Sequence, residues 1–218
     1  MNISLKQYFL INIVLLLYNS QIKIPLTFFP VHSVNFNTPG NIMQYYIEQR
    51  AYANLEIGNP KQTVQIPLEF DSNDFYIINY DILNNDTRHF SGFKLYNSSR
   101  SVNYMKLDED YRSGYYFDLA EYVMDTFYFN NKSYSIEFYS PLVYQYCDSG
   151  GIGMQLNPPS DIYDATPNKE RTFIEKLKKR ELAKDYSWSI FYNTKENTKQ
   201  DEGFLLLGCL PHEINDND

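Results

Sequence analysis

The chain has 218 residues, enough for one sizeable domain or two small ones, and its 43% hydrophobic content against 21% charged residues excludes a largely disordered chain. Its formal net charge of −8 argues against nucleic-acid binding, which requires a basic surface, so no nucleic-acid partner is expected. The 21 Tyr and 15 Phe residues suit pleated, half-buried surfaces and therefore favour β structure.

The first element along the chain is an export signal, predicted over residues 1–20. Lys6 precedes the apolar run YFLINIVLLLY. The core of this run, about ten residues, has the length of a signal peptide and is too short to span a bilayer. A short membrane anchor is the alternative. Export predicts a secreted protein, or one held in a secretory or lysosome-like vesicle.

Export would permit two kinds of modification. Cys147 and Cys209 allow at most one intrachain disulfide, with two free thiols as the alternative. The triplets that begin at Asn85, Asn97 and Asn131 fit the N-glycosylation pattern. Such triplets also arise by chance in an Asn-rich chain, so they are weak support for export.

An extended lead-in is expected at residues 21–42, because this stretch contains three prolines and has no clear period. Two strand-like runs follow at about 45–57 and 62–70, and the GNP between them predicts a hairpin. More strands are predicted in DFYIINYDI, in YMKLDEDYRSGYYFDLAEYVMDTFYF with a turn at RSG, and in YSIEFYSPLVYQY.

One helix interrupts this pattern, and we predict it at about residues 167–182. Thr166 is placed as an N-cap and Pro167 as the first helical residue, where the missing N–H has no cost. Phe173, Ile174 and Leu177 would share the apolar face. The stretches WSIFY and GFLLLGCL then return to strand.

The sequence has no pattern typical of a metal or phosphate site. His32, His89 and His212 are scattered in polar or Pro-flanked segments and are expected at the surface. No Gly-rich loop follows a strand and opens a helix, and nothing local indicates a Ser or Cys triad. We therefore expect no cofactor and no metal.

Four stretches, in order over residues 45–213, resemble the pepsin-like aspartic protease family. YANLEIGNPKQTVQIPLEFD resembles its opening hairpin, and GGIGMQLNPPS resembles its Asp-Gly-Ile-Leu-Gly-Leu stretch. TFIEKLKKRELAKDYSWSIFY resembles its helix and following strand, and GFLLLGCLPHE resembles its Gly-x-Leu-x-Leu-Gly-Gly strand. The resemblance implies a mostly β fold: a single first lobe at residues 43–214, built of packed, twisted β-sheets with one main helix.

The resemblance also implies the site residues. Asp71 matches the first catalytic aspartate, and Ser72 matches the Thr or Ser that follows it. Asn73 stands where the family has Gly, and Asn is the next best residue at a positive φ. Tyr111, in YRSG, resembles the tyrosine of the flap that covers the cleft, although Arg112 replaces a glycine there. An ordinary strand tyrosine is the alternative reading.

The chemistry of this family needs two facing carboxylates that share one proton, because two like charges so close cannot both ionise. One acts as base toward water while the other donates to the substrate carbonyl. Asp148, in CDSGG, follows Asp71 too soon to be the second aspartate and is read as a turn residue. The partner carboxylate is therefore expected from a second lobe in trans or from a homodimer.

The implied function is aspartic-type hydrolysis of peptide bonds in a peptide or protein substrate, with the lone chain inactive. The alternatives are a non-catalytic secreted module that binds peptides or proteins, or a truncated copy of a bilobed protease. QIKIPL, residues 21–26, is similar to the start of a zymogen propeptide and is expected to stay attached as an edge strand. The resemblance would also bring Cys147 near Cys209, where a bridge closing a loop of about 60 residues would stabilise the fold by about 4 kcal/mol.

Overall fold

In a computed structural model of the chain, residues 22–29, 50–70, 72–83, 94–111, 119–143, 150–155, 172–193 and 201–208 are described. They form ten strands and one α-helix, with short 3₁₀ turns at η1 (Tyr80–Leu83) and η3 (Ser98–Arg100). The elements are β1 (Ile22–Phe29), β2 (Arg50–Ile57), β3 (Gln62–Glu69), β4 (Phe75–Ile77), β5 (Met105–Tyr111), β6 (Leu119–Phe129), β7 (Lys132–Val143), β8 (Gly150–Gly153), α3 (Phe173–Lys179), β9 (Trp188–Asn193) and β10 (Asp201–Leu207). The expected mostly β fold with one main helix is confirmed for these residues.

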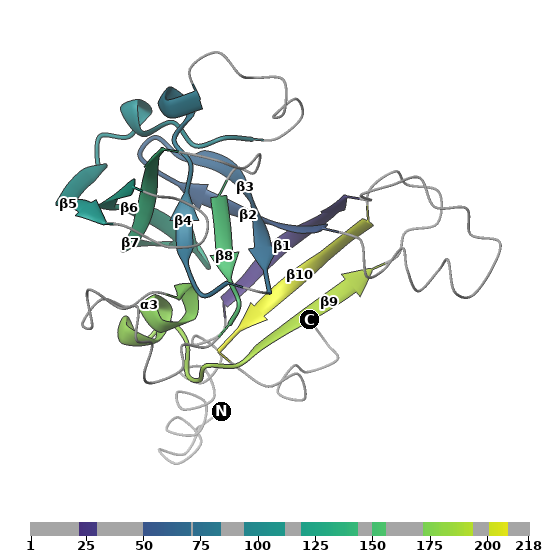
Figure 1. Cartoon of the computed structure of the whole chain (residues 1–218). Coiled ribbons are helices and arrows are strands. Elements are labelled where there is room, and N and C mark those ends of the chain that lie inside the picture. Colours follow the sequence, from purple (N-terminus) through teal and green to yellow (C-terminus); the bar gives the residue numbers. More distant parts are fainter. Residues whose placement is uncertain are drawn as a thin grey trace, which may run out of the picture.

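All ten strands belong to one mixed sheet that closes on itself. Its order is β5-β6-β7-β4-β8-β3-β2-β1-β10-β9, and β6 also pairs with β2 through Phe127 and Ile57. Strands β2, β3, β8, β4, β7 and β6 therefore form a closed barrel. Figure 1 shows this barrel beside the long strands β1, β10 and β9, with α3 next to it. The packed sheets expected from the sequence are thus parts of one continuous sheet.

The predicted hairpin over the GNP turn is confirmed as β2 and β3. The two strands pair from Tyr52–Pro67 to Ile57–Gln62, and the turn begins at Gly58 with φ 88°. Glycine adopts this left-handed conformation without a steric penalty. WSIFY and the first five residues of GFLLLGCL are likewise confirmed as strands, in β9 and β10, while Cys209 and Leu210 lie outside the described residues. The run DFYIINYDI forms a shorter strand than expected, because β4 covers only Phe75–Ile77 before η1 begins.

The lead-in strand β1 lies inside the sheet, so the expectation of an edge strand at residues 21–26 is wrong. β1 pairs with β10 on one side and with β2 on the other. Its side chains alternate between buried and exposed, and Ile22, Ile24 and Leu26 are all at most 2% exposed. Pro25 lies opposite Phe204 in the β1–β10 pair, one residue before the pairing with β2 begins at Leu26.

The helix begins later than predicted. Thr172 is extended, with φ −77° and ψ 151°, and is the N-cap of α3, so a continuous helix from Pro167 to residue 182 is excluded. The Thr172 side chain accepts a hydrogen bond from the Glu175 N–H, and the Glu175 side chain accepts one from the Thr172 N–H. This reciprocal capping box is also encoded in the sequence TFIE, which fits the helix start better than Thr166 does. Residues 166 and 167 lie outside the described part of the chain.

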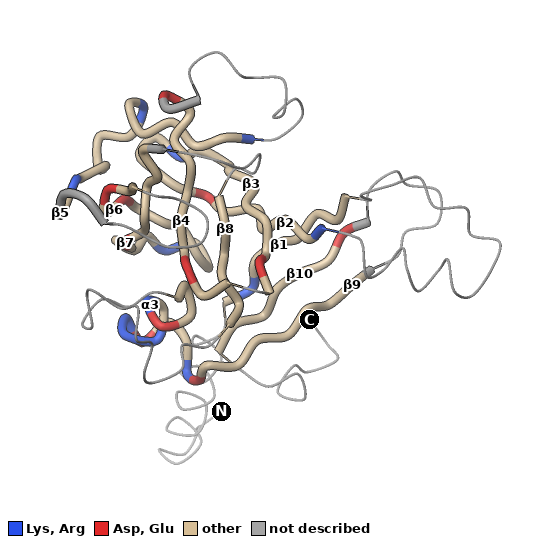
Figure 2. The backbone as a smooth tube through the Cα atoms, viewed as in Figure 1, with Lys and Arg blue, Asp and Glu red and all other residues tan. Residues whose placement is uncertain are grey.

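One core connects the barrel, the β1 and β10 strands, and α3. Phe173 of α3 packs on Phe75 of β4, with ring centroids 4.5 Å apart, and also contacts Phe129 of β6. A smaller cluster on β4, the residue after it, β6 and β7 contains Tyr76, Ile78, Ala120, Tyr122 and Tyr139. The charged residues of the described backbone are scattered, apart from a basic run along α3 (Figure 2).

Candidate active-site loop

The loop between β3 and β4 is the candidate site, because it carries the sequence position of Asp71. β8 lies between β3 and β4: it runs parallel to β3, with Leu68 paired to Ile152, and antiparallel to β4, with Phe75 paired to the same residue. Since two strands that are consecutive in sequence straddle a third, the short connection between them must cross the end of β8. Asp71 itself lies outside the described residues, and its catalytic role stays a prediction.

The residues on both sides of Asp71 are held by the backbone of β8 and the segment after it. The N–H of Gly153 donates to the Asp74 carbonyl at 2.8 Å, and the N–H of Met154 donates to the Glu69 carbonyl at 2.8 Å. The N–H of Gln155 donates to the carbonyl of Ser72 at 3.0 Å. Three successive donors therefore fix the loop at its start, middle and end.

The buried side chain of Ser72 stabilises the loop through a hydrogen bond to the loop backbone. It is 6% exposed, and its Oγ accepts a hydrogen bond from the Asp74 N–H at 3.1 Å. A serine hydroxyl that bonds the backbone two residues on reproduces a tight turn without a glycine. Asn73, expected at a positive φ, is not among the described non-glycine residues with that conformation, which are Asn130, Asn131 and Glu181.

The close backbone approach that the loop needs comes from Gly153 in β8. A Cβ added to Gly153 would lie 2.4 Å from the Asn73 carbonyl carbon and 2.6 Å from the Asp74 nitrogen. No residue other than glycine fits there without a backbone shift. The stretch GGIGM, singled out in the sequence for its resemblance, therefore lies against the loop that contains Asp71.

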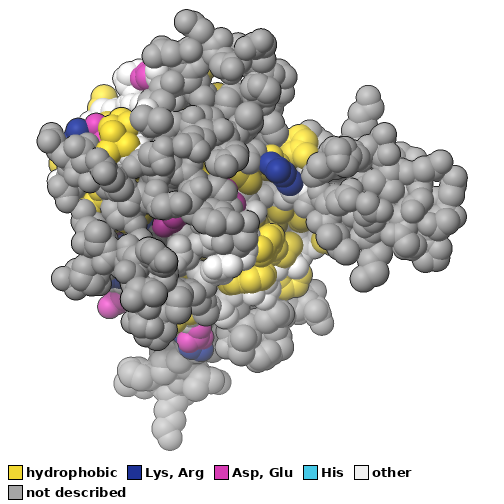
Figure 3. Space-filling model, in the orientation of Figure 1, with side chains coloured by type: hydrophobic (Ala, Val, Ile, Leu, Met, Phe, Trp, Pro, Cys, Tyr) yellow, Lys and Arg dark blue, Asp and Glu magenta, His cyan; other side chains and the backbone are white. Residues whose placement is uncertain are grey.

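Two side-chain contacts next to the site are not predicted from the sequence. The Tyr76 hydroxyl, in β4, donates a hydrogen bond of 2.8 Å to the Glu69 carboxylate at the end of β3. The side chain of Phe70 is 52% exposed and lies next to Trp188 of β9, with ring centroids 5.7 Å apart. Hydrophobic side chains gather on the visible face around β9 and β10 (Figure 3). In the sequence, the only sign of the Glu69–Tyr76 pair is an acidic residue two positions before Asp71.

The other predicted site residues are placed only in part. Tyr111 is the last residue of β5, but its side chain and the following residues lie outside the described part, so the flap role is untested. Cys147, Cys209 and Asn85 also fall outside it, as do the three histidines.

Two of the three candidate glycosylation positions are described. Asn131 is exposed in the turn between β6 and β7, with φ 61°. Asn97 is half-buried before η3, and its side-chain oxygen accepts a hydrogen bond of 2.6 Å from Ser99. Asn131 is therefore the more accessible of these two positions.

A buried carboxylate lies elsewhere in the barrel, on β6. Asp125 is 1% exposed and accepts hydrogen bonds from the Tyr96 hydroxyl at 2.5 Å, the Ser101 hydroxyl at 2.9 Å and the Thr126 N–H at 2.7 Å. Burial, together with the bond to Asp125, raises the pKa of Tyr96 far above its ordinary value. Ser101 in turn accepts from the Asn59 N–H at 2.9 Å, which ties this network to the β2–β3 turn. With all these donors satisfied, the network reads as structural support.

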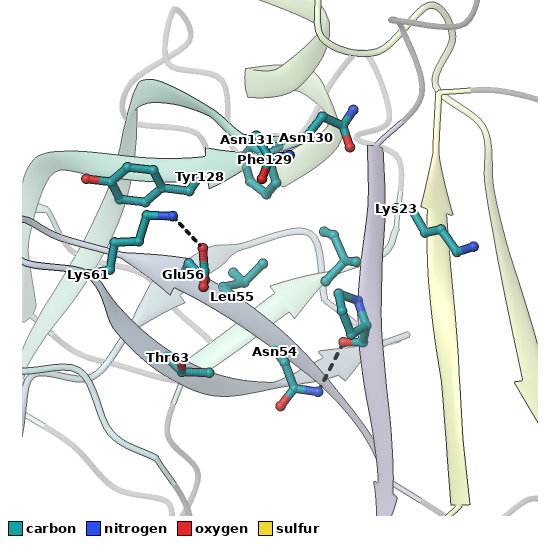
Figure 4. Close-up of a pocket in the computed structure, with 12 residues that line it drawn as sticks. Lys23, Asn54, Leu55, Glu56, Lys61, Thr63, Tyr128, Phe129, Asn130 and Asn131 are labelled. Atoms are coloured by element: carbon teal, nitrogen blue, oxygen red, sulfur yellow. Dashed lines mark hydrogen bonds and ion pairs between the residues drawn. The ribbon is translucent and has the colours of Figure 1, made fainter.

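A pocket of about 320 Å³ opens between β1, β2 and the β6–β7 turn (Figure 4). Three of its polar side chains have partners: Lys61 pairs with Glu56 at 3.0 Å, and the Asn54 amide donates to the Pro25 carbonyl at 3.2 Å. None of its lining residues belongs to the 69–76 segment. It is therefore separate from the candidate site.

Comparison of the sequence with protein-family models and with curated proteins found no match. Among the described residues, no helix has the length and apolar character needed to cross a bilayer. Within the same residues, no three acidic, histidine or cysteine side chains cluster as they would around a metal ion.

Proposed function

We propose that this chain is one lobe of a pepsin-like acid peptidase, in which Asp71 supplies one of two catalytic carboxylates. The observation that carries the proposal is the loop across β8. In this loop, the carbonyls of Ser72 and Asp74 accept hydrogen bonds from the backbone N–H groups of residues 155 and 153, and Gly153 of GGIGM allows the close backbone approach. When the backbone of a loop is held in this way, a carboxylate on the loop can be placed precisely for catalysis.

The chemistry requires a second carboxylate opposite the first. Two carboxylates that share a proton divide the roles, one as base toward the attacking water and one as acid toward the substrate carbonyl. Asp71 is the one aspartate in the sequence that follows a matching strand and is itself followed by the matching Ser, Ser72. A second lobe in trans or a second copy of this chain would supply the partner. The substrate would be a peptide or protein. The apolar segment after Lys6 favours activity in the secretory pathway.

The test is hydrolysis of a fluorogenic peptide library at acid pH over a wide range of protein concentration. If two copies assemble the site, the rate rises faster than linearly with concentration. Asp71→Asn, which keeps the shape and removes the titration, should lower the rate at least about a hundredfold. Asp81→Asn, an exposed acidic residue in η1, is the matched control and should leave the rate unchanged. Activity that is linear in concentration and survives Asp71→Asn would move the chemistry elsewhere.

A peptide-binding module without catalysis is the second candidate, and the exposed pair of Phe70 and Trp188 favours it. Large aromatic side chains at the surface are typical anchors in binding sites. This function predicts no hydrolysis at any pH or concentration, together with saturable peptide binding. Trp188→Ala would then weaken binding about tenfold or more, while Tyr186→Ala, another exposed aromatic nearby in the chain, would not.

A further inference from the structure

A hydrogen bond spans β8 directly below the candidate loop. Tyr76 of β4 and Glu69 of β3 lie on opposite sides of β8, and their side chains meet over it at 2.8 Å. We call this contact the Glu69–Tyr76 bridge. It joins the residue that begins the loop to the second residue of the strand that follows it.

Gly151 makes room for this bridge. Tyr76 is the register partner of Gly151 in the β4–β8 pair. A Cβ added at Gly151 would lie 2.4 Å from Tyr76 Cε1 and 2.6 Å from both Cδ and Oε2 of Glu69. Any side chain at this position would force the two bridge residues apart. Two of the three glycines of β8 thus have separate roles: Gly153 makes room for the loop, and Gly151 makes room for the bridge.

The hydroxyl of Tyr76 is held in place by packing. The side chain is 4% exposed and belongs to the cluster with Tyr122 and Tyr139, and Tyr139 is its register partner in β7. At the far side of that cluster, the fully buried Lys176 of α3 donates to the Tyr122 hydroxyl at 3.2 Å. A tyrosine fixed by its ring presents its hydroxyl in one direction, so it can orient the carboxylate that it bonds.

We infer that Glu69 and Tyr76 are positioning residues for Asp71, because their bridge fixes both ends of the loop that carries it. This inference rests on the proposed function, in which the placement of Asp71 matters for catalysis. Neither residue is assigned contact with the substrate. Displacing a catalytic group by about 1 Å can lower a rate by about two orders of magnitude, so a bridge at the base of the loop has a measurable effect.

The first experiment tests the Glu69–Tyr76 bridge without an activity assay. Hydrogen exchange is measured at the amides of Gly153, Met154 and Gln155, which donate to the loop. Tyr76→Phe should speed their exchange about tenfold or more, beyond any change in global unfolding. Tyr96→Phe is the matched control, since it removes another buried tyrosine–carboxylate bond far from the loop in sequence. Equal local exchange in the two variants would overturn the inference.

Conservative rescue adds a second criterion. Glu69→Gln keeps a side-chain oxygen that can accept the Tyr76 hydroxyl, whereas Glu69→Leu removes it. The amides at 153–155 should stay protected in Glu69→Gln and lose protection in Glu69→Leu. Loss of protection in neither variant would argue that the bridge does not hold the loop.

Kinetics then separate this inference from the proposed function. In the hydrolysis assay, Tyr76→Phe should lower kcat about tenfold or more with little change in KM, and Tyr96→Phe should not. If the wild-type protein hydrolyses peptides and Tyr76→Phe keeps full kcat, the positioning role is wrong. If the wild-type protein never hydrolyses a peptide, the proposed function fails, while the exchange data still decide whether the bridge orders the loop.

Discussion

At the residue scale, the two tyrosine–carboxylate pairs, one buried and one partly buried, are the features least visible in the sequence. Asp125 and Glu69 lie on different strands, and each accepts a tyrosine hydroxyl, from Tyr96 and Tyr76 respectively. With 21 tyrosines in the chain, no single one stands out before the fold brings it to a carboxylate. Buried polar groups must find partners, so these pairs restrict how the strands can be arranged.

The protonation of Tyr96 gives a prediction for alkaline pH. Burial, and then the hydrogen bond to Asp125, raise the pKa of Tyr96 above its ordinary value of 10.0. Above about pH 10 the unfolded chain releases this proton and the folded protein keeps it. The stabilisation is therefore complete below that pH and is lost as the pH rises, by about 1.4 kcal/mol per pH unit for one group.

Urea unfolding at several pH values between 9 and 11.5 measures this effect. The free energy of unfolding of Tyr96→Phe should fall less steeply with pH than that of the wild type. Part of the pH dependence of the free energy of unfolding should remain in the variant. The reason is that burial, followed by the charge of Glu121, raises the pKa of Tyr104 as well. If the free energy of unfolding fell equally steeply with pH in the two proteins, the raised pKa of Tyr96 would be contradicted.

At the element scale, α3 supports the candidate site through its first turn. Phe173, at the start of the helix, packs on Phe75, the residue that follows the loop. Arg180, at the end of the helix, donates to the carbonyls of Lys176 and Ser135 and pairs with Glu137 of β7. The helix is thus fixed to β4 at one end and to β7 at the other.

The capping box at the start of α3 is open to a direct test. Thr172→Ala removes the acceptor of the Glu175 N–H and should lower the free energy of unfolding by about 1 kcal/mol. Glu175→Gln is the control, because glutamine also completes a capping box. Thermal or urea unfolding should show the loss in the first variant and little change in the second. No loss in Thr172→Ala would contradict the role of the cap, and an equal loss in both would mean that the charge of Glu175 also contributes to stability.

At the scale of the whole molecule, β1 joins the barrel to the two C-terminal strands. It pairs with β2 of the barrel and with β10, which in turn pairs with β9. Among the described residues, the connection of β9 and β10 to the barrel sheet therefore runs through β1. An N-terminus processed before Ile22 would leave this strand intact.

The interior position of β1 predicts a large cost for its disruption. Ile24→Ala, at a side chain 1% exposed, should lower the free energy of unfolding by about 2–4 kcal/mol. Lys23→Ala, the exposed neighbour over the Phe204 ring, should cost less than about 1 kcal/mol. Removal of the chain through Phe29 should abolish cooperative unfolding of β9 and β10 with the barrel. Calorimetry of the three variants checks this, and a stable truncated protein would contradict the role of β1.

The sequence alone determined those features whose signals are local. The hairpin of β2 and β3 follows from two β-rich runs around a Gly-Asn-Pro turn, and α3 follows from the shared apolar face of Phe173, Ile174 and Leu177. The capping box TFIE is also present in the sequence, although the N-cap predicted from the sequence is Thr166 and not Thr172. Such signals are readable because turn chemistry and periodicity depend on residues only a few positions apart.

Only the tertiary structure decided which distant segments meet. The four residues of β8 lie between β3 and β4 because Gly151 and Gly153 let a backbone pass beneath a side-chain bridge and a loop. β1 became an interior strand because its alternating apolar side chains are buried between β2 and β10. The pairing partner of a short strand is set by the burial and backbone contacts that it gains across the whole fold, and local pattern does not encode these.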